Sequence, residues 1–530
     1  MTLHDTIPIV VGVTGHRDIR PEDRDVLYNA VKQELTALQS RCPHSEIVMQ
    51  NSLADGADRL CAEVARDLSV PLIAVLPMDR TEYEKDFSPE AIPAFRSLCD
   101  AAEDCFVAPD TERAPASKDR DFAYRQAGVY AASHAHVLFA LWDGAESSAS
   151  NCGTAAIVRC ALDGDFSPED SIPLGGCCPV LHILSPRKGD ETSTAGAVRF
   201  LGDRAAFDET LSRTDEFNRL AKKAPASESA LMPSDRETDR QLDRMEILYA
   251  KADSLSVRFA KQYRRILAAL AIISTIITIA FLLYDEAELH GMILVCGGML
   301  LLAWLVQRYG NRFASHRRYL EYRMLAEGLR VQAFLRYAGS GLCASDVLSH
   351  SAQTETGWVA SALKVLSVGA APVCAHRIRD AWVDEQRRYH ERSVGRSARA
   401  QKGSERIVRA ALWVSILLYL AVLAFELIWG GLLPFSRQIA NAEFYRTLSK
   451  LLLGSISAAA LFISNYYGRL SLSRTTSDHV KMERFYAAVL DRIDRFGESE
   501  ALLRLIAREE LIENGNWCSY QRDNTADFNL

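Results

Sequence analysis

The chain has 530 residues, of which 48% are hydrophobic, and a formal net charge of −7 at pH 7. This balance excludes the basic domain that nucleic-acid binding requires, so no nucleic-acid partner is expected. The 12 cysteines show no regular spacing and Cys177 and Cys178 are adjacent, which favours a reducing compartment over a disulfide framework. No clustered cysteine or histidine pairs predict a metal site, so no metal cofactor is expected.

Short β-branched runs alternate with amphipathic stretches from residue 7 to about residue 187. The predicted strands are 7–13, 46–49, 72–76, 105–107, 137–141 and 180–184. Strands separated by helices of this length predict an α/β, Rossmann-like, doubly wound parallel sheet in a domain spanning 1–190. Ligands of such sheets bind outside the carboxyl ends of the strands.

Glycines and polar residues follow three of these strands. They occur in the loops 14–17, 52–58 and 142–154. Glycine lets the backbone approach a ligand closely, and a helix N-terminus favours phosphate. Taken one by one, these glycines are more typical of ordinary turns, and Asp58 and Thr154 of helix caps. Three such loops on one edge favour a nucleotide cleft.

The same loops carry a family resemblance. Thr14-Gly15-His16-Arg17, SLADGADRLCAEVA (52–65) and ALWDG followed by CGTAAIV (140–158) resemble the SLOG superfamily, Rossmann-like nucleotide-binding domains that include the LOG phosphoribohydrolases and Smf/DprA-like proteins. The resemblance covers roughly residues 8–187 and implies that loops after the first and fifth strands hold the phosphate and ribose of a nucleotide-derived ligand. Carried over by motif, the implied ligand-binding residues are Thr14, Gly15, His16, Arg17, Gly56, Asp58, Asp143, Gly144, Gly153 and Thr154.

One departure from this family bears on catalysis. The LOG hydrolases carry a PGGxGTxxE-type motif whose Glu serves catalysis, but residues 151–158 here read NCGTAAIV, without a carboxylate. Glycosidic cleavage then lacks its obvious proton donor. No catalytic residue is therefore assigned, and binding without turnover is favoured over a membrane-anchored nucleotide hydrolase of LOG type.

The composition changes between residues 191 and 235. Lysine, acidic and small residues with two proline-containing breaks predict a partly flexible linker with one short helix near 207–221. A long amphipathic pattern follows over 236–265 and leads into the first apolar run.

Four apolar runs, in two pairs, dominate the C-terminal half. They cover 266–284, 289–307, 410–433 and 450–468, each near the ~20 residues that a helix needs to cross about 30 Å of hydrocarbon. Helices are the expected spanning form because lipid offers backbone groups no other partner. The prediction is an all-α membrane domain of two hairpins, with the lipid bilayer as its partner.

Flanking charges set the expected topology. Basic residues cluster before the first run and after the second, whereas the turn between them carries Asp285, Glu286 and Glu288. The positive-inside rule then places both ends in the cytoplasm. The second hairpin is less clear, since its outer turn carries Arg437 and Arg446. No signal-peptide pattern follows Met1. A multi-pass protein of the inner (plasma) membrane with cytoplasmic N- and C-terminal domains is expected.

The membrane half shows an internal repeat. Two modules, 236–390 and 391–530, each contain a hairpin, a following amphipathic helix (317–337 and 478–496) and a Trp-x-x-x-Gln-Arg signature (382–387 and 517–522). A two-span hairpin with following cytoplasmic helices is similar to the SLATT effectors of bacterial conflict systems. That resemblance implies a homo-oligomer that perforates or depolarises the membrane in antiviral defence. The tryptophans themselves are typical of helix-packing anchors.

Glu426 is the acidic residue inside a predicted span. An ionisable group in a membrane is a candidate pore residue by default, but Glu426 lies near the outer end of its helix, where a side chain also reaches the headgroups. The resulting hypothesis is a membrane effector that senses a nucleotide second messenger, either ADP-ribose-like or a cyclic nucleotide. A transporter is disfavoured by the small number of spans and of intramembrane polar groups.

Overall fold

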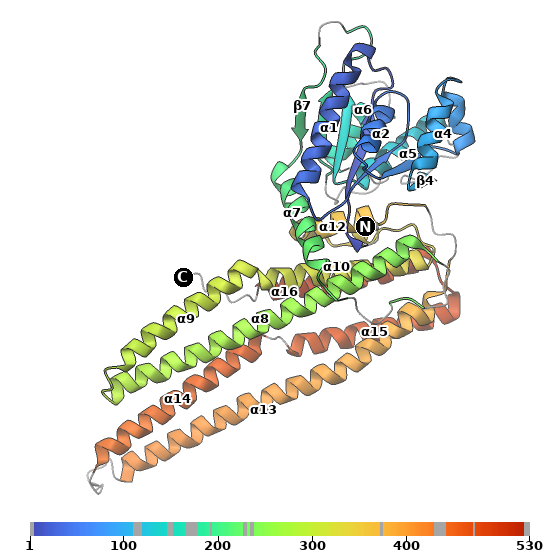
Figure 1. Cartoon of the computed structure of the whole chain (residues 1–530). Coiled ribbons are helices and arrows are strands. Elements are labelled where there is room, and N and C mark those ends of the chain that lie inside the picture. Colours follow the sequence, from blue (N-terminus) through green and yellow to red (C-terminus); the bar gives the residue numbers. More distant parts are fainter. Residues whose placement is uncertain are drawn as a thin grey trace. The chain divides into compact units, whose positions relative to one another are not determined.

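The computed structural model (Figure 1) describes residues 5–109, 119–145, 152–164, 177–190, 193–225, 231–233, 238–370, 375–428, 441–469 and 472–523. Within these ranges the strands are β1 Ile9–Gly15, β2 Ile47–Asn51, β3 Leu72–Leu76, β4 Asp104–Val107, β5 Val137–Trp142, β6 Val180–Leu184 and β7 Val198–Leu201. The helices of the first half are α1 Arg24–Arg41, α2 Ala57–Asp67, α3 Arg80–Tyr83, α4 Ile92–Ala101, α5 Arg120–Ser133, α6 Thr154–Asp163 and α7 Arg204–Ala221. Those of the second half are α8 Arg240–Glu286, α9 Met292–Phe313, α10 Ser315–Tyr337, α11 His350–Glu355, α12 Gly357–Leu366, α13 Glu385–Ile428, α14 Ala442–Arg469, α15 Leu472–Phe496 and α16 Glu500–Asp523.

The strands form one sheet in the order β4-β3-β2-β1-β5-β6-β7. The pairings from β4 to β6 are parallel, and β7 runs antiparallel to β6. Helices connect the parallel strands, so the predicted α/β class is confirmed and each of the six predicted strands is present. The strand order reverses between β1 and β5, which makes the gap between their carboxyl ends a topological switch point.

Burial explains why these segments form strands and helices. Each residue of β5 is buried, as expected for a central parallel strand whose two faces are both covered by helices. α1 contributes Leu27, Val31, Leu35 and Leu38, which recur every three or four residues and so line one face of the helix. This stripe joins the core beneath β1 and β2.

β7 and α7 lie in the segment that the sequence predicted to be a linker. α7 places Phe207 and Leu211 in the core of the sheet. Its Asn218 accepts a hydrogen bond from the Ile7 N–H (2.9 Å) and donates one to the Ile7 carbonyl (2.8 Å). Residues 198–221 are therefore an integral part of the sheet domain. The helix predicted near 207–221 is present as α7, but the polar composition of the stretch gave no sign that its apolar face joins the core of the sheet.

The chain divides into two compact units. Unit 1 comprises Met1–Leu255, Glu321–Ile378 and Glu498–Trp517, and unit 2 comprises Ser256–Leu320, Arg379–Gly497 and Cys518–Leu530. Parts of both segments predicted as membrane modules thus group with the sheet. Inside unit 1, Phe217 of α7 packs against Tyr322 of α10 (ring centroids 5.5 Å apart) and Trp358 of α12 (6.2 Å).

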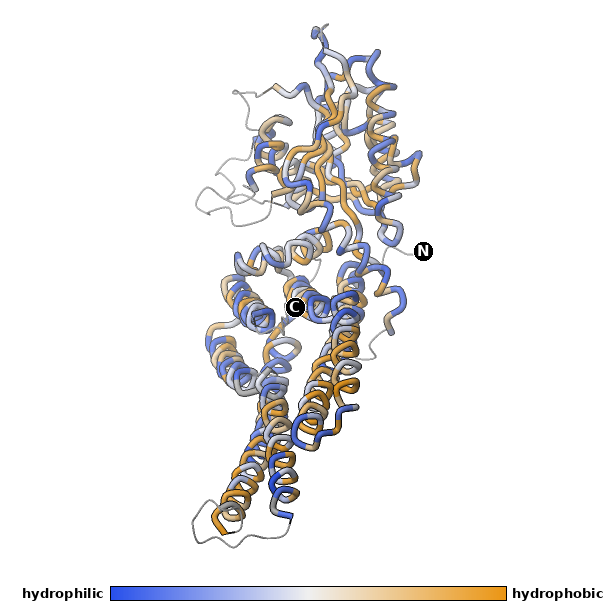
Figure 2. The backbone as a smooth tube through the Cα atoms, turned by 90° about the vertical axis from the view of Figure 1, so that its left-hand side faces the viewer, coloured by the Kyte–Doolittle hydropathy of each residue, from blue (hydrophilic) through white to orange (hydrophobic). Residues whose placement is uncertain are grey.

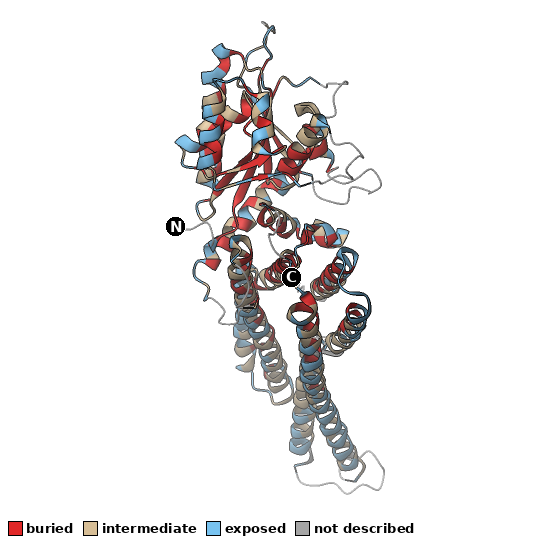
Figure 3. Cartoon of the chain, turned by 90° about the vertical axis from the view of Figure 1, so that its right-hand side faces the viewer, coloured by how far each residue is buried: buried red, intermediate tan, exposed pale blue. Residues whose placement is uncertain are grey.

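The predicted spans fall within α8, α9, α13 and α14. These four helices are long and apolar enough to cross a membrane, and little of each apolar window is buried by the protein itself. Apolar residues gather in the lower parts of these helices in Figure 2, and Figure 3 shows mostly exposed and intermediate positions there. α13 is described as far as Ile428, so the end of the third predicted span lies outside the described residues. The structure is consistent with a membrane protein.

In unit 2, the first hairpin contacts the second where α8 packs against α14. Gly454 leaves room for Leu282, whose Cδ1 would lie only 2.7 Å from a Cβ at that position. Near the same helix ends, Lys450 forms a 2.8 Å ion pair with Glu286. Small residues at such crossings let helix backbones approach closely.

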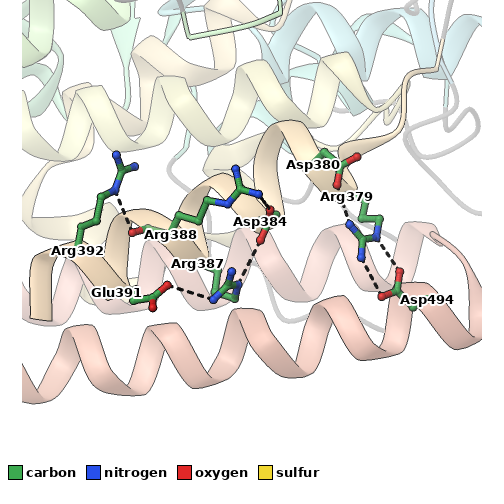
Figure 4. A network of polar contacts seen from close by, with 8 residues as sticks. All are labelled: Arg379, Asp380, Asp384, Arg387, Arg388, Glu391, Arg392 and Asp494. Atoms are coloured by element: carbon green, nitrogen blue, oxygen red, sulfur yellow. Dashed lines mark hydrogen bonds and ion pairs between the residues drawn. The ribbon is translucent and has the colours of Figure 1, made fainter.

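A π-helical turn, η5 (Arg379–Asp384), precedes α13. It buries Trp382 completely, in agreement with a packing role, whereas Trp517 is half-buried. Figure 4 shows Arg379 making two hydrogen bonds to Asp494 of α15 (2.7 and 2.9 Å). Asp384, the last residue of the turn, forms ion pairs with Arg387 (3.2 Å) and Arg388 (2.6 Å) in the first turn of α13.

Candidate functional site

The loops after β1 and β5 meet at the switch point. Thr14 and Gly15 pair in register with Ala140 and Leu141, and the His16 N–H continues the ladder to the Leu141 carbonyl (3.0 Å). A Cβ on Gly15 would lie 2.3 Å from the Cβ of Ala57. Glycine is therefore required here because α2 packs directly on the end of β1.

Gly56 brings the third loop to the same place. Its φ of +82° is in the left-handed region, and a Cβ would lie 2.4 Å from the Arg17 carbonyl oxygen and 2.5 Å from that of His16. The next residue, Ala57, donates its N–H to the His16 carbonyl at 3.0 Å. The proposed site residues of the loops 14–17 and 56–58, namely Thr14, Gly15, His16, Arg17, Gly56 and Asp58, therefore lie together beside the end of β5.

His16 and Asp143 form the centre of this arrangement. The Asp143 N–H donates to His16 Nε2 at 3.2 Å, and the same nitrogen lies 3.3 Å from Asp143 Oδ1. Burial, with the charge of Arg187 as a second cause, lowers the pKa of His16. A neutral imidazole whose Nε2 accepts from the backbone satisfies both observations, so the Oδ1 contact is no ion pair at neutral pH.

Arg187 is a site residue that the sequence did not single out. It follows β6 and its Nε donates to Asp143 Oδ2 at 2.9 Å, while the Ala145 N–H donates to Asp143 Oδ1 at 3.0 Å. Desolvation opposes ionisation of Asp143, but these two hydrogen bonds and the neighbouring His16 together hold its pKa below the ordinary value. Its position just after a predicted strand was the available signal.

Asp58 is buried in the first turn of α2. Its Oδ2 accepts from the Ala54 N–H at 3.4 Å, and Asn51 braces this loop by donating to the Asp58 carbonyl (2.7 Å). The residue at the N-cap is Gly56, and no side chain caps the helix, so Asp58 is not the cap that its position suggested. Desolvation raises the pKa of Asp58 to about 7.

Arg17 points its guanidinium over the ring of Tyr124, 4.7 Å from the centroid. It is exposed, and in the part of the chain that the structure describes it has no ion pair or hydrogen bond. Tyr124 itself donates to Asp86. The Tyr124 ring also lies 6.1 Å from that of Tyr83, and the sequence singled out neither because scattered aromatic residues carry no motif.

Gly144, Gly153 and Thr154 are placed less fully. Gly144 has a φ of +82° beside Asp143, and Gly153 precedes Thr154 at the start of α6 without a left-handed backbone. Residues 146–151, including Asn151 of the predicted loop, lie outside the described residues. Within the described ranges, no hydrogen bond links Gly153 or Thr154 to His16 or Asp143.

Glu426 belongs to α13, but its side chain lies outside what the structure describes. In the described ranges, no group of three His, Cys, Asp or Glu side chains is arranged to hold a metal ion. The cysteines at described positions are free thiols.

The site as a whole is suited to binding an anion. It combines the exposed Arg17 guanidinium, Arg187 and the backbone of two glycine-containing loops at the carboxyl ends of β1 and β5. Residues 152–158 provide no carboxylate for general acid catalysis. Comparison of the chain with protein-family models, with curated proteins and with solved structures found no match.

Proposed function

We propose that this protein is a membrane-embedded effector that binds a nucleotide-derived second messenger through its sheet domain and then permeabilises or depolarises the membrane. The observation that carries the proposal is the meeting of His16, Arg17, Gly56 and Asp143 at one switch point, in a chain that also has four candidate spans. The resemblance of residues 14–17, 52–65 and 140–158 to SLOG domains, and of the hairpins to SLATT effectors, supports it. A role in bacterial antiviral defence is part of the proposal.

Coupling between ligand and membrane is assigned to α8. This helix is continuous from Arg240 to Glu286, so residues grouped with the sheet and residues of the first predicted span belong to one element. A ligand shifts an opening or oligomerisation equilibrium only by its difference in affinity for the two states, about 1.4 kcal/mol for each tenfold change in population.

Leakage from liposomes tests the proposal. The full chain is reconstituted with an entrapped dye and exposed to ADP-ribose, cyclic nucleotides and nucleoside monophosphates. One of these classes should release the dye, and Arg17→Gln should abolish the response. Arg66→Gln is the matched control, because this arginine of α2 is 67% exposed and, among the residues that the structure describes, pairs with its neighbour Asp67 alone. Dye release that is the same with and without nucleotides, or a full response in Arg17→Gln, contradicts the proposal.

A membrane-anchored nucleotide hydrolase is the second candidate. The observation in its favour is a neutral imidazole, His16, held against the ionised carboxyl group of Asp143. Such a pair can accept and hold a proton. Recovery of a cleaved nucleotide after incubation with the full chain, and its loss in Asp143→Ala, would establish this activity. Recovery of intact nucleotide would favour the sensor.

A further inference from the structure

One end of the first hairpin, formed by α8 and α9, is rich in basic side chains and has no carboxylate beside it in the chain. Neither 254–284 nor 289–320 includes an aspartate or a glutamate. Six basic residues of these stretches form the basic end: Arg258, Lys261, Arg264 and Arg265 of α8, and Arg308 and Arg312 of α9. Among the residues that the structure describes, none of these six side chains has an ion pair or a hydrogen bond. In the described chain, these positive charges therefore lack a partner.

The four basic-end residues of α8 lie on one side of the helix. Arg258, Lys261 and Arg265 are spaced by three and four residues, which places them one above the other on one face. Arg264 lies beside this row. All four residues are exposed. They form a strip of positive charge directly before the apolar run that begins at residue 266.

α9 brings the other two charges to the same level. Ile266 packs on Gly310, where an added Cβ would lie 3.3 Å from the Ile266 Cδ1. Arg308 and Arg312 are each two residues from Gly310, near the end of α9. The charges of the two helices therefore meet at one end of the candidate spans.

Aromatic side chains of α9 border the basic end. Trp304 is 54% exposed and Tyr309 is 52% exposed. The Arg308 guanidinium lies over the Trp304 ring, 5.6 Å from its centroid, and Tyr309 contacts Phe313 with ring centroids 4.5 Å apart. Exposed tryptophan and tyrosine beside basic residues are typical of the level at which a spanning helix passes from hydrocarbon to headgroups. This pattern favours a lipid surface over a soluble acidic partner.

The second hairpin has carboxylates at the corresponding end. Arg409, directly before the third apolar run, pairs with Glu405 at 3.3 Å. After the fourth run, Arg474 lies 3.8 Å from Asp478. Such exposed pairs add little stability, but each places a negative charge beside a positive one. The second hairpin is thus partly neutralised where the first is not.

The chemistry of the basic end favours an anionic phosphate group. A guanidinium forms paired hydrogen bonds with phosphate oxygens, and the lysine ammonium attracts the same charge. A basic residue near an anionic membrane surface raises affinity about fivefold. Zwitterionic lipids carry a phosphate too, but their own positive group is repelled by a strip of like charge. Anionic phospholipids should therefore be preferred.

We propose that the basic end of the first hairpin is a binding surface for the headgroups of anionic phospholipids, with phosphate on the exposed arginines and on Lys261. The proposal goes beyond the proposed function, on which it rests only for the embedding of the hairpins in a bilayer. It makes anionic lipid a specific partner of the first hairpin.

The lipids retained by the full chain test this surface. The chain is placed in nanodiscs of equal amounts of phosphatidylcholine and phosphatidylglycerol and extracted into detergent, and the bound lipids are counted by mass spectrometry. The wild type should retain phosphatidylglycerol in excess over phosphatidylcholine. Arg265→Gln should lower this ratio by up to about fivefold, and Arg265→Lys, which keeps the charge, should preserve most of it.

Arg409→Gln is the matched control. It removes the same charge at the same position relative to an apolar run, but from an arginine already paired with Glu405. Its lipid ratio should change by less than about twofold. The fourfold variant Arg258→Gln, Lys261→Gln, Arg264→Gln and Arg265→Gln should return the ratio to that of the nanodisc. If that variant fails to insert, the single substitutions still decide the question.

Three results would overturn the proposal. The first is a wild type that retains the two lipids in their starting ratio. The second is an equal effect of Arg265→Gln and Arg409→Gln, which would mean that net charge alone attracts the lipid. The third is binding of polyglutamate or polyuridylate to the chain in phosphatidylcholine nanodiscs, lost in Arg265→Gln, without any lipid preference. That result would assign the basic end to a soluble acidic partner.

Failure of this proposal is distinguishable from failure of the effector function, because the lipid ratio is measured without any nucleotide. A chain that retains phosphatidylglycerol with the expected variant pattern, yet releases no dye with any nucleotide, keeps the lipid surface and loses the effector function. A chain that releases dye in response to a nucleotide, but retains lipids in their starting ratio, keeps the function and loses the lipid surface.

Discussion

The sheet and the spanning helices use the same apolar side chains in opposite ways. Leu138 and Leu141 of β5 are fully buried, whereas Leu294 of α9 is 78% exposed, Leu417 of α13 is 62% exposed and Leu461 of α14 is 67% exposed. In the sheet, hydrophobicity builds a core, and the polar groups that enter it are few and costly. Along the spans, apolar side chains face outward, as they do where the solvent is lipid.

The largest expected effect is the loss of folding stability that ionisation of the buried Asp58 causes in the sheet domain. The pKa of Asp58 is about 7 in the folded protein, against an ordinary value of 3.8. Its contribution to stability is then fully present below pH 4 and is lost as the pH rises through 7. Relative to Asp58→Asn, the wild type should lose up to about 4 kcal/mol between pH 4 and pH 8.

Thermal unfolding of the two full chains at a series of pH values measures this difference. The Asp58→Asn variant should equal the wild type near pH 4 and exceed it near pH 8. A difference that stays constant with pH would show that Asp58 is ionised in the folded protein like an exposed carboxylate.

The next effect tests how closely the sheet loops pack. Gly56→Ala combines a left-handed φ with a Cβ only 2.4 Å from the Arg17 carbonyl oxygen, and should destabilise by about 3 kcal/mol. Gly189→Ala has a similar φ (+101°) but no neighbour within 4 Å, so about 1 kcal/mol is expected. Equal losses of thermal stability would mean that backbone strain alone, without the contact, accounts for the glycine at 56.

A charge introduced at an exposed apolar position tests whether the spanning helices face lipid. Leu417→Arg should cost about 3 kcal/mol of membrane insertion, because the exposed leucine lies on a candidate span and would face hydrocarbon in a bilayer. A glycosylation reporter after α13 measures the inserted fraction. Val26→Arg is the control: it lies on α1 and is 49% exposed, yet should change the stability of the chain by less than about 0.5 kcal/mol. Normal insertion of Leu417→Arg would argue that α13 does not face lipid there.

The smallest effect concerns the ion pair between the hairpins. Lys450 and Glu286 are 2.8 Å apart, but their side chains are 60% and 24% exposed. Exposed pairs contribute about 0.2–1 kcal/mol. A double-mutant cycle of Lys450→Ala and Glu286→Gln, measured by thermal unfolding in nanodiscs, should give a coupling energy of about 0.5 kcal/mol. A coupling of several kcal/mol would show that water is excluded from this pair.

The sequence predicted the parts of the fold whose patterns are periodic or contiguous. The six parallel strands and the four apolar runs were found because β-branched runs and long hydrophobic stretches report burial directly. β7 was missed because two of its residues, Val198 and Arg199, are exposed at the edge of the sheet, so little apolar pattern remains. The compact unit that gathers residues 321–378 and 498–517 with the sheet depends on contacts between distant segments, which no local pattern encodes.

The site residues divide in the same way, into those marked by a local sequence pattern and those that depend on contacts between distant segments. The loop residues His16, Gly56 and Asp143 were found because they follow predicted strands and share a motif. Arg187 was not, because only its hydrogen bond to Asp143 brings it to the site. That property belongs to the packed structure and has no counterpart in the order of residues.

The continuity of α8 has a mechanical consequence. Its 47 residues correspond to a length of about 70 Å and contain neither glycine nor proline, the residues at which helices bend most readily. α13 is nearly as long but includes Gly395 and Gly403. Rotation of α8 at residue 240 should therefore reach residue 286 with little bending of the helix. α13 should bend more readily at its glycines, so less of a rotation at its start should reach its end. By this criterion α8 is the stiffer of the two long helices and α13 the more easily bent.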